Sequence, residues 1–147
     1  MTFPAGGMEG FRRAVIENRG YNTAVMGITY VEGLVGPASG RVGEAKIRFL
    51  VDTRAFYTVV PADVARNAGI KPARTERVRF ADGRTARWRI GEARLRVNGR
   101  STATWVLFGR PGTQPLLGAY TLEGMGLVVN SRTRKLSPSP EVIVAGI

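Results

Sequence analysis

Residues 49–61 read FLVDTRAFYTVVP, and this stretch decides the fold. Three apolar residues lead into Asp52 and Thr53, and a second apolar run, 58–60, ends at Pro61. Short apolar runs rich in β-branched residues are typical of buried β-strands. The sequence therefore predicts two strands joined by a loop that begins with an aspartate at a buried strand end. An unpaired carboxylate is costly to bury, so a second carboxyl group, a cation or hydrogen bonds must compensate. The simpler alternative is a turn aspartate that ends a strand.

Working outward, strand-like segments recur at short spacing from residue 26 onward, with turn residues between them. Asp82 and Gly83 lie between two such segments, and Asp-Gly is a strong hairpin signal. Two short helices are expected, one at 62–67 after Pro61 and one at 120–124. The predicted strands are 26–35, 42–51, 58–60, 78–80, 86–90, 92–97, 102–108 and 127–129. This pattern indicates an all-β domain with one or two short helices.

A chain of 147 residues fits a single domain with a modest core. We expect three parts: an N-terminal extension over 1–25, the β domain over 26–137 and a tail over 138–147. Within the extension, residues 11–18 favour a short helix. Three interpretations of the extension stay open, namely an arm, a propeptide-like segment and an over-extended reading frame. The tail is apolar and β-prone at 141–145.

The sequence contains neither cysteine nor histidine. Disulfides, thiolate nucleophiles, zinc-finger sites and serine–histidine triads are therefore excluded. Acid–base chemistry must rest on Asp, Glu, Lys or Tyr, and the aspartates are Asp52, Asp63 and Asp82. Asp63 is explained by the first turn of a helix and Asp82 by its hairpin turn. Asp52 remains as the candidate catalytic residue, and we predict neither a metal nor a cofactor.

The net charge is +11, carried mainly by arginine. Such a charge fits either nucleic-acid binding or a preference for arginine on solvated faces. The arginines are spread along the chain without a basic run, so we expect no specific nucleic-acid partner and only weak, salt-sensitive association. No stretch approaches the roughly 18 apolar residues that span a bilayer, and the first residues do not resemble a signal peptide. We therefore expect a cytoplasmic protein without membrane contact.

Four features of residues 27–136 occur in an order that resembles the single-domain retropepsin-like (clan AA) aspartic proteases of prokaryotes. The first is the segment 49–61, in which Phe56 matches the branch that carries Asp-Thr-Gly-Ala-Phe. The second is the hairpin at Asp82-Gly83, about thirty residues after the aspartate. The third is 115–118, which reads PLLG, and the fourth is 121–129, a helix followed by a strand. Each feature alone is weak, but four in the right order are specific.

The resemblance implies a small, closed acid-protease barrel that acts as a homodimer, since each chain supplies one aspartate of a catalytic pair. It assigns catalysis to Asp52, and the tail 141–147 to the dimer interface. The expected substrate is an extended peptide or protein segment, cleaved by a water activated between two carboxylates. It also assigns supporting roles to three sets: the active-site loop (Thr53, Arg54 and Ala55), the flap (Ala81, Asp82, Gly83 and Arg84) and the strand behind the loop (Leu116, Leu117 and Gly118). Thr53 is expected to form a hydrogen-bond lock with the other subunit.

Arg54 departs from the family pattern, which has glycine at this position. Its side chain would project into the cleft, and its charge would favour a carboxylate over the carboxylic acid that the mechanism needs. Two alternatives stay open: the side chain points to solvent, or it selects acidic residues in a substrate. The leading interpretation is an aspartic endopeptidase. The alternative is a catalytically inactive dimer of the same fold that binds peptides or proteins.

Overall fold

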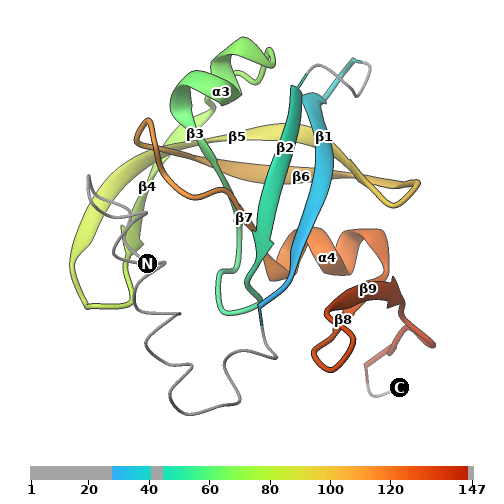
Figure 1. Ribbon diagram of the computed structural model, residues 1–147. Helices are drawn as coiled ribbons and strands as arrows, with labels where there is room; N and C mark the ends of the chain where they lie inside the picture. Colours follow the sequence, from blue (N-terminus) through green and yellow to red (C-terminus); the bar gives the residue numbers. More distant parts are fainter. Residues whose placement is uncertain (1–27, 41–44, 146–147) are drawn as a thin grey trace.

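The computed structural model describes residues 28–40 and 45–145. Most of this part of the chain forms β-strands, and two short helices follow β3 and β7 (Figure 1). The elements in chain order are β1 (Tyr30–Pro37), β2 (Ala45–Val51), β3 (Thr58–Pro61), α3 (Ala62–Asn67), β4 (Arg74–Arg79), β5 (Thr85–Val97), β6 (Arg100–Gly109), β7 (Leu116–Leu117), α4 (Ala119–Met125), β8 (Leu127–Asn130) and β9 (Lys135–Pro138).

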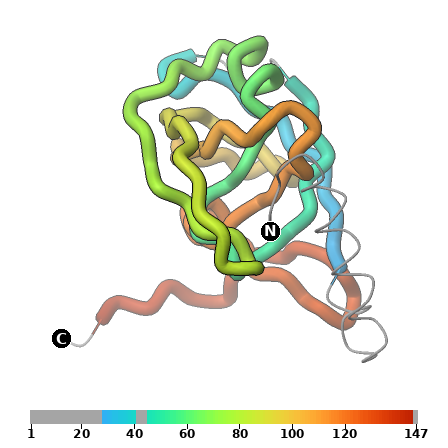
Figure 2. Tube along the Cα trace, turned by 90° about the vertical axis from the view of Figure 1, so that its left-hand side faces the viewer, coloured from blue at the N-terminus to red at the C-terminus, as the bar shows by residue number. Residues whose placement is uncertain are grey.

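Seven strands form one sheet in the order β1-β2-β7-β3-β6-β5-β4. β1 also pairs with β5, in a register that places Leu34 opposite Arg96 and Pro37 opposite Ala93. This extra pairing closes six of the strands into a ring, and β4 extends from the ring as the partner of β5. Figure 2 shows the resulting barrel, with the hairpin of β4 and β5 at its side. The predicted all-β, barrel-like fold is confirmed.

Both faces of the central strands are buried, which explains why their sequences are apolar runs rather than alternating patterns. In β3, Val60 lies in the main core inside the barrel, whereas Val59 lies in a second, smaller core. In β7, Leu117 and Leu116 divide between the two cores in the same way. The second core also contains Leu50, Trp88, Ile90 and Leu107. It packs on the side of the sheet that faces the β4–β5 hairpin.

From β3 onward the element boundaries lie within two residues of the sequence predictions, with three differences; the strand starts predicted at 26 and 42 lie outside the described residues. The strand predicted at 78–80 is β4, which begins four residues earlier, at Arg74. The two segments predicted at 86–90 and 92–97 are one strand, β5, which continues through Gly91. A glycine is needed there because a Cβ atom at Gly91 would collide with the carbonyl group of Lys71. β9 was not predicted from the sequence, and it pairs with β8 and includes Pro138, the first residue of the expected tail. The helix expected at 11–18, and the whole of 1–25, lie outside the described residues.

The chain after β9 runs away from the barrel (Figure 2). Residues 141–145 form no strand, although their sequence is β-prone. Val142, Ile143 and Val144 are exposed, because no other part of the described chain covers them. Among the described residues, no helix has both the length and the apolar character needed to cross a membrane.

Candidate active site

Asp52 is the first residue after β2 and begins a loop, 52–57, that leads into β3. The preceding residues, Phe49, Leu50 and Val51, are all buried, and they carry Asp52 to the edge of the second core. Only 9% of the Asp52 side chain is exposed. The expectation of a carboxyl group at a buried strand end therefore holds. We call residues 52–57 the Asp52 loop.

β7 lies behind the Asp52 loop and holds its first residue in place. It pairs in parallel with β2, and the backbone N–H of Asp52 donates to the Leu117 carbonyl over 3.1 Å. The next residue, Gly118, lies so close to the loop that an added Cβ would be 2.6 Å from the Tyr57 carbonyl carbon and oxygen. Only a residue without a side chain fits here. Residues 116–118 therefore lie behind the Asp52 loop.

The start of α4 holds the other half of the loop. The backbone N–H groups of Ala119 and Tyr120 donate to the carbonyls of Ala55 and Phe56, both over 2.9 Å. These donors belong to the first turn of the helix, where they have no partner within the helix. The Asp52 loop thus satisfies the end of α4, and α4 in return fixes the loop.

Three threonine hydroxyls connect β3, β6 and α4 beneath the loop. Thr121 lies in the middle, with its Oγ1 atom 2.6 Å from Thr58 Oγ1 and 2.7 Å from Thr104 Oγ1. Thr58 Oγ1 also accepts a hydrogen bond from the Gly118 backbone N–H over 3.1 Å. All three threonines are buried. We call this set the threonine chain; the sequence analysis missed it because the three residues lie far apart in sequence.

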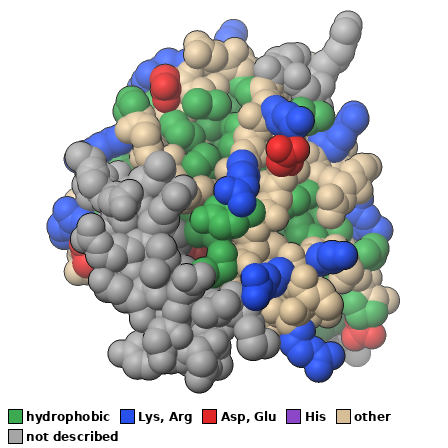
Figure 3. All heavy atoms as spheres, viewed as in Figure 1, with side chains coloured by type: hydrophobic (Ala, Val, Ile, Leu, Met, Phe, Trp, Pro, Cys, Tyr) green, Lys and Arg blue, Asp and Glu red, His purple; other side chains and the backbone are tan. Residues whose placement is uncertain are grey.

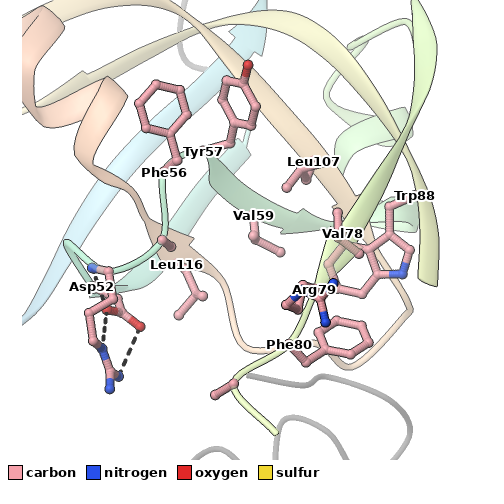
Figure 4. A pocket seen from close by; sticks show the side chains of 13 residues that line it. Asp52, Phe56, Tyr57, Val59, Val78, Arg79, Phe80, Trp88, Leu107 and Leu116 are labelled. Carbon is pink, nitrogen blue, oxygen red and sulfur yellow. Dashed lines mark hydrogen bonds and ion pairs between the residues drawn. The ribbon is translucent and has the colours of Figure 1, made fainter. Parts of the chain in front are cut away.

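Arg54 folds back onto Asp52 and contacts both carboxylate oxygens (Figure 4). Its Nε donates to Asp52 Oδ1 over 3.1 Å, and its Nη2 donates to Oδ2 over 3.3 Å. The Arg54 backbone N–H adds a third bond, to Oδ1 over 3.0 Å. The guanidinium group therefore compensates the buried charge of Asp52 from the solvent side, where 71% of the Arg54 side chain is exposed.

The β4–β5 hairpin carries Asp82-Gly83 at its exposed tip. Gly83 has φ +91°, a left-handed conformation that glycine adopts without strain. The backbone N–H of Arg84 donates to Asp82 Oδ1 over 3.0 Å, and Arg84 Nε donates to Oδ2 over 2.8 Å. The backbone hydrogen bond is the main reason that the pKa of Asp82 lies below its usual value, and the Arg84 side chain lowers it further.

A cleft of about 460 Å³ lies between the Asp52 loop and this hairpin. Its lining is mostly apolar, and Figure 4 shows Asp52 on one side with Arg79, Phe80 and Trp88 on the other. The complete lining is Asp52, Arg54, Ala55, Phe56, Tyr57, Val59, Val78, Arg79, Phe80, Ala81, Trp88, Leu107 and Leu116. A concave, largely apolar site with a few polar groups is typical of ligand-binding clefts.

The structure brings some of the predicted site residues to the cleft and leaves others outside it. Asp52, Arg54, Ala55, Ala81 and Leu116 line it. Thr53 is exposed beside it, and the hairpin tip lies beyond the lining with Asp82, Gly83 and Arg84 exposed. Leu117 is buried behind the loop, in the main core, and Gly118 lies behind the loop as well.

Apart from Ala81, the cleft residues of the hairpin were not predicted from the sequence, above all Arg79 and Trp88. The alternation of Ala86, Trp88 and Ile90 in β5 was the available signal, because these residues share one face of the strand. Phe56 was noted only as part of the loop motif. Its ring packs against Tyr57 and Tyr120, with ring centroids 4.8 and 5.6 Å apart, and points away from Asp52 (Figure 4).

On the face seen in Figure 3, lysine and arginine side chains are scattered between apolar groups and do not gather into a continuous basic surface. Acidic side chains are few on this face. Within residues 28–40 and 45–145, no three acidic side chains come together as a metal site.

Comparison with known families gives one clear match. A family model described as gag-polyprotein putative aspartyl protease matches residues 38–124, more than half of the chain. This range includes the Asp52 loop, the β4–β5 hairpin, β7 and most of α4. Among curated protein sequences, no significant relative is found.

Viral proteases are among the solved structures of similar fold. The EIAV protease in complex with the inhibitor HBY-793 superposes with a TM-score of 0.53 at 16% identity, covering 67% of this chain and 88% of that one. A foamy viral protease–reverse transcriptase in complex with an RNA/DNA hybrid gives a TM-score of 0.50 at 14% identity, covering 80% of this chain and 13% of that one. The Simian Foamy Virus (mac) protease gives 0.47 at 19% identity, covering 65% and 92%. At these identities the likeness to the EIAV enzyme shows the fold alone.

Proposed function

The chain belongs to the gag-polyprotein putative aspartyl protease family, and on this premise we propose that it is one protomer of a homodimeric aspartic endopeptidase. The observation that carries the proposal is the position of Asp52, a buried carboxylate at the end of β2 that lines the cleft beside the β4–β5 hairpin. The finer placement in the prokaryotic Asp-Thr-Gly-Ala-Phe branch is part of the same proposal and rests on the sequence motifs.

The chemistry requires two carboxyl groups, and the Asp52 loop supplies one. Two such groups at close distance share a single proton, because both cannot ionise comfortably side by side. The ionised member then takes a proton from a water molecule, while the protonated member donates to the peptide carbonyl. A second copy of Asp52, related by a two-fold axis, completes the pair.

Two exposed features support a dimer. The side chain of Thr53 is exposed next to Asp52, where a second subunit would cover it in the proposed hydrogen-bond lock. The tail presents Val142, Ile143 and Val144 with 85%, 84% and 71% of their surface exposed. Three consecutive exposed apolar residues fit a strand that pairs with another chain. A protein ending at residue 140 that kept its dimeric mass in solution would remove the tail from the interface.

A second candidate function has an observation of its own, the contact of Arg54 with both oxygens of Asp52. A catalytic water needs at least one of those oxygens. With both engaged, the same cleft would bind an extended peptide by main-chain hydrogen bonds without cleaving it. This describes an inactive, peptide-binding dimer.

Peptide cleavage separates the two functions. The native chain, Asp52→Asn and Arg54→Gly would be incubated with a diverse peptide mixture from about pH 4 to 7, a range that includes the raised second pKa of a carboxyl pair. Products are identified by mass spectrometry, with pepstatin as an inhibitor. We expect Arg54→Gly to cleave at least tenfold faster than the native chain, and Asp52→Asn to be inactive.

Arg110→Gly is the matched control, because it removes an exposed arginine that does not line the cleft. It should cleave like the native chain. Equal rates for the native chain and Arg54→Gly, with Asp52→Asn inactive, would mean an active protease that tolerates Arg54. No cleavage by any variant, with peptides still bound, would establish the second function instead.

A further inference from the structure

The charged side chains that line the cleft carry a net positive charge. Asp52 contributes one carboxylate, whereas Arg54 and Arg79 contribute two guanidinium groups, so one positive charge remains. A positive charge in a mostly apolar cleft attracts an anionic ligand group more strongly than the same charge in open water.

Arg54 is placed to bind such a group while it contacts Asp52. Its contacts to Asp52 use Nε and one N–H of Nη2, and these are its side-chain hydrogen bonds within the described part of the chain. A guanidinium group carries five N–H donors in a planar fork. The donors of Nη1 and the second donor of Nη2 are therefore left for a carboxylate that approaches from the exposed side.

Arg79 lies on β4, across the cleft from Asp52, the residue that Arg54 contacts (Figure 4). Its Nη1 donates to the Gly83 carbonyl over 3.2 Å, which directs the side chain along the hairpin. None of the four ion pairs found among the described residues includes Arg79. Its charge is thus not compensated by a carboxylate of the described chain.

The walls between the two arginines are apolar. They consist of Val59, Leu107 and Leu116 from the sheet, with Phe80 and Trp88 from the hairpin. We propose that the cleft selects extended peptides in which an acidic side chain is flanked by large apolar residues, and that Arg54 and Arg79 determine this specificity. The inference rests on the proposed function only in taking the cleft as a peptide site.

The bound carboxylate would add to the contacts of Arg54 without displacing Asp52, because it uses the donors that Asp52 does not occupy. One guanidinium group would then hold both anions by charge-assisted hydrogen bonds.

The test uses the full chain and short fluorescein-labelled peptides of Val, Leu and Phe, with Glu placed at each central position in turn. Matched peptides carry Gln or Lys at the same position. Binding is measured by fluorescence anisotropy at about 0.3 M salt, which screens attraction beyond roughly 6 Å. We expect the best Glu peptide to bind roughly tenfold tighter than its Gln counterpart, and the Lys peptide weakest.

Arg79→Gln and Arg54→Gln should each lower the Glu-to-Gln affinity ratio about threefold or more. The matched control is Arg77→Gln, which removes the same charge from the same strand at an exposed position outside the cleft lining. Arg77→Gln should leave the ratio unchanged. An equal loss in Arg77→Gln and Arg79→Gln would show that only the overall charge acts, and equal affinity for the Glu and Gln peptides would overturn the inference.

The same peptides are analysed for cleavage by mass spectrometry, so the two proposals can fail separately. A Glu preference in binding without any cleavage supports the inference and contradicts the endopeptidase. Cleavage without a Glu preference supports the endopeptidase and contradicts the inference of acidic-peptide specificity. Where cleavage interferes with the anisotropy, the ratio of kcat/KM replaces the affinity ratio.

Discussion

Asp52-Thr53-Arg54 and Asp82-Gly83-Arg84 form two turns of the same local design. In both, the arginine backbone N–H donates to the first aspartate oxygen over 3.0 Å. In both, the arginine Nε contacts the carboxylate, over 3.1 Å in the first turn and 2.8 Å in the second. The bonds join residues two apart in the chain, so both turns are closed by contacts within an Asp-x-Arg sequence.

The two turns differ in their surroundings. The Asp52 loop is held from behind by β7, by the start of α4 and by the threonine chain, and the Asp52 side chain is 9% exposed. The Asp82 side chain is 50% exposed, and a Cβ added to Gly83 would meet no atom within 4 Å. The comparison shows that one local ion pair becomes a part of a cleft or a solvated turn according to the elements packed against it.

The largest effect should come from replacing one glycine at each turn, namely Gly118 behind the Asp52 loop and Gly83 within the hairpin tip. Gly118 has ordinary extended angles, φ −91° and ψ 172°, so its replacement fails through collision with Tyr57. Gly83 has open space but φ +91°, so its replacement fails through backbone strain. We expect Gly118→Ala to lower the free energy of unfolding by about 3 kcal/mol and Gly83→Ala by about 1 kcal/mol.

Urea unfolding followed by circular dichroism measures both variants. A smaller loss in Gly118→Ala than in Gly83→Ala would contradict the view that the Asp52 loop is the more tightly packed of the two turns.

A second effect concerns the threonine chain, which supports only the Asp52 loop. Thr121→Val removes the central hydroxyl and leaves the hydroxyls of Thr58 and Thr104 without that buried partner. We expect a loss of about 2 kcal/mol in the free energy of unfolding. Thr75→Val, the same change at an exposed position of β4, should alter stability by no more than about 0.5 kcal/mol. Equal stabilities for the two variants would show that the threonine chain contributes nothing to the loop.

The smallest effect is the titration of Asp82. Its pKa lies below the usual 3.8, first because of the backbone N–H of Arg84 and then because of the Arg84 side chain. Because the pKa is lower in the folded state, the ionised carboxyl group stabilises the hairpin when the pH is above the ordinary pKa of 3.8. This stabilisation is lost as the pH falls through the lower, folded-state pKa.

NMR titration of the Asp82 carboxyl carbon tests this directly. Arg84→Gln keeps the backbone N–H, so the pKa should rise only part of the way toward 3.8. A complete return to 3.8 would assign the whole shift to the side chain and contradict the order of the two causes.

Much of the fold followed from the sequence, because its signals are local. The apolar runs on either side of Asp52, Pro61 before α3 and Asp82-Gly83 between β4 and β5 each constrain the backbone within a few residues. The helix expected at 62–67 has those bounds in the structure, and the strand 116–117 lies behind the Asp52 loop. The sequence also showed that Arg54 stands where the family has glycine, which raised the question of whether its side chain blocks the cleft.

Only the tertiary structure decided how these parts combine. The sequence left Arg54 free to point at solvent, into the cleft or at a substrate, and the structure places it on both oxygens of Asp52. Arg79 and Trp88 enter the site because the β4–β5 hairpin lies across from the loop, and Thr58, Thr104 and Thr121 meet although 63 positions separate the first from the last. Such contacts depend on side-chain rotamers and on pairings between distant strands, which no local pattern specifies.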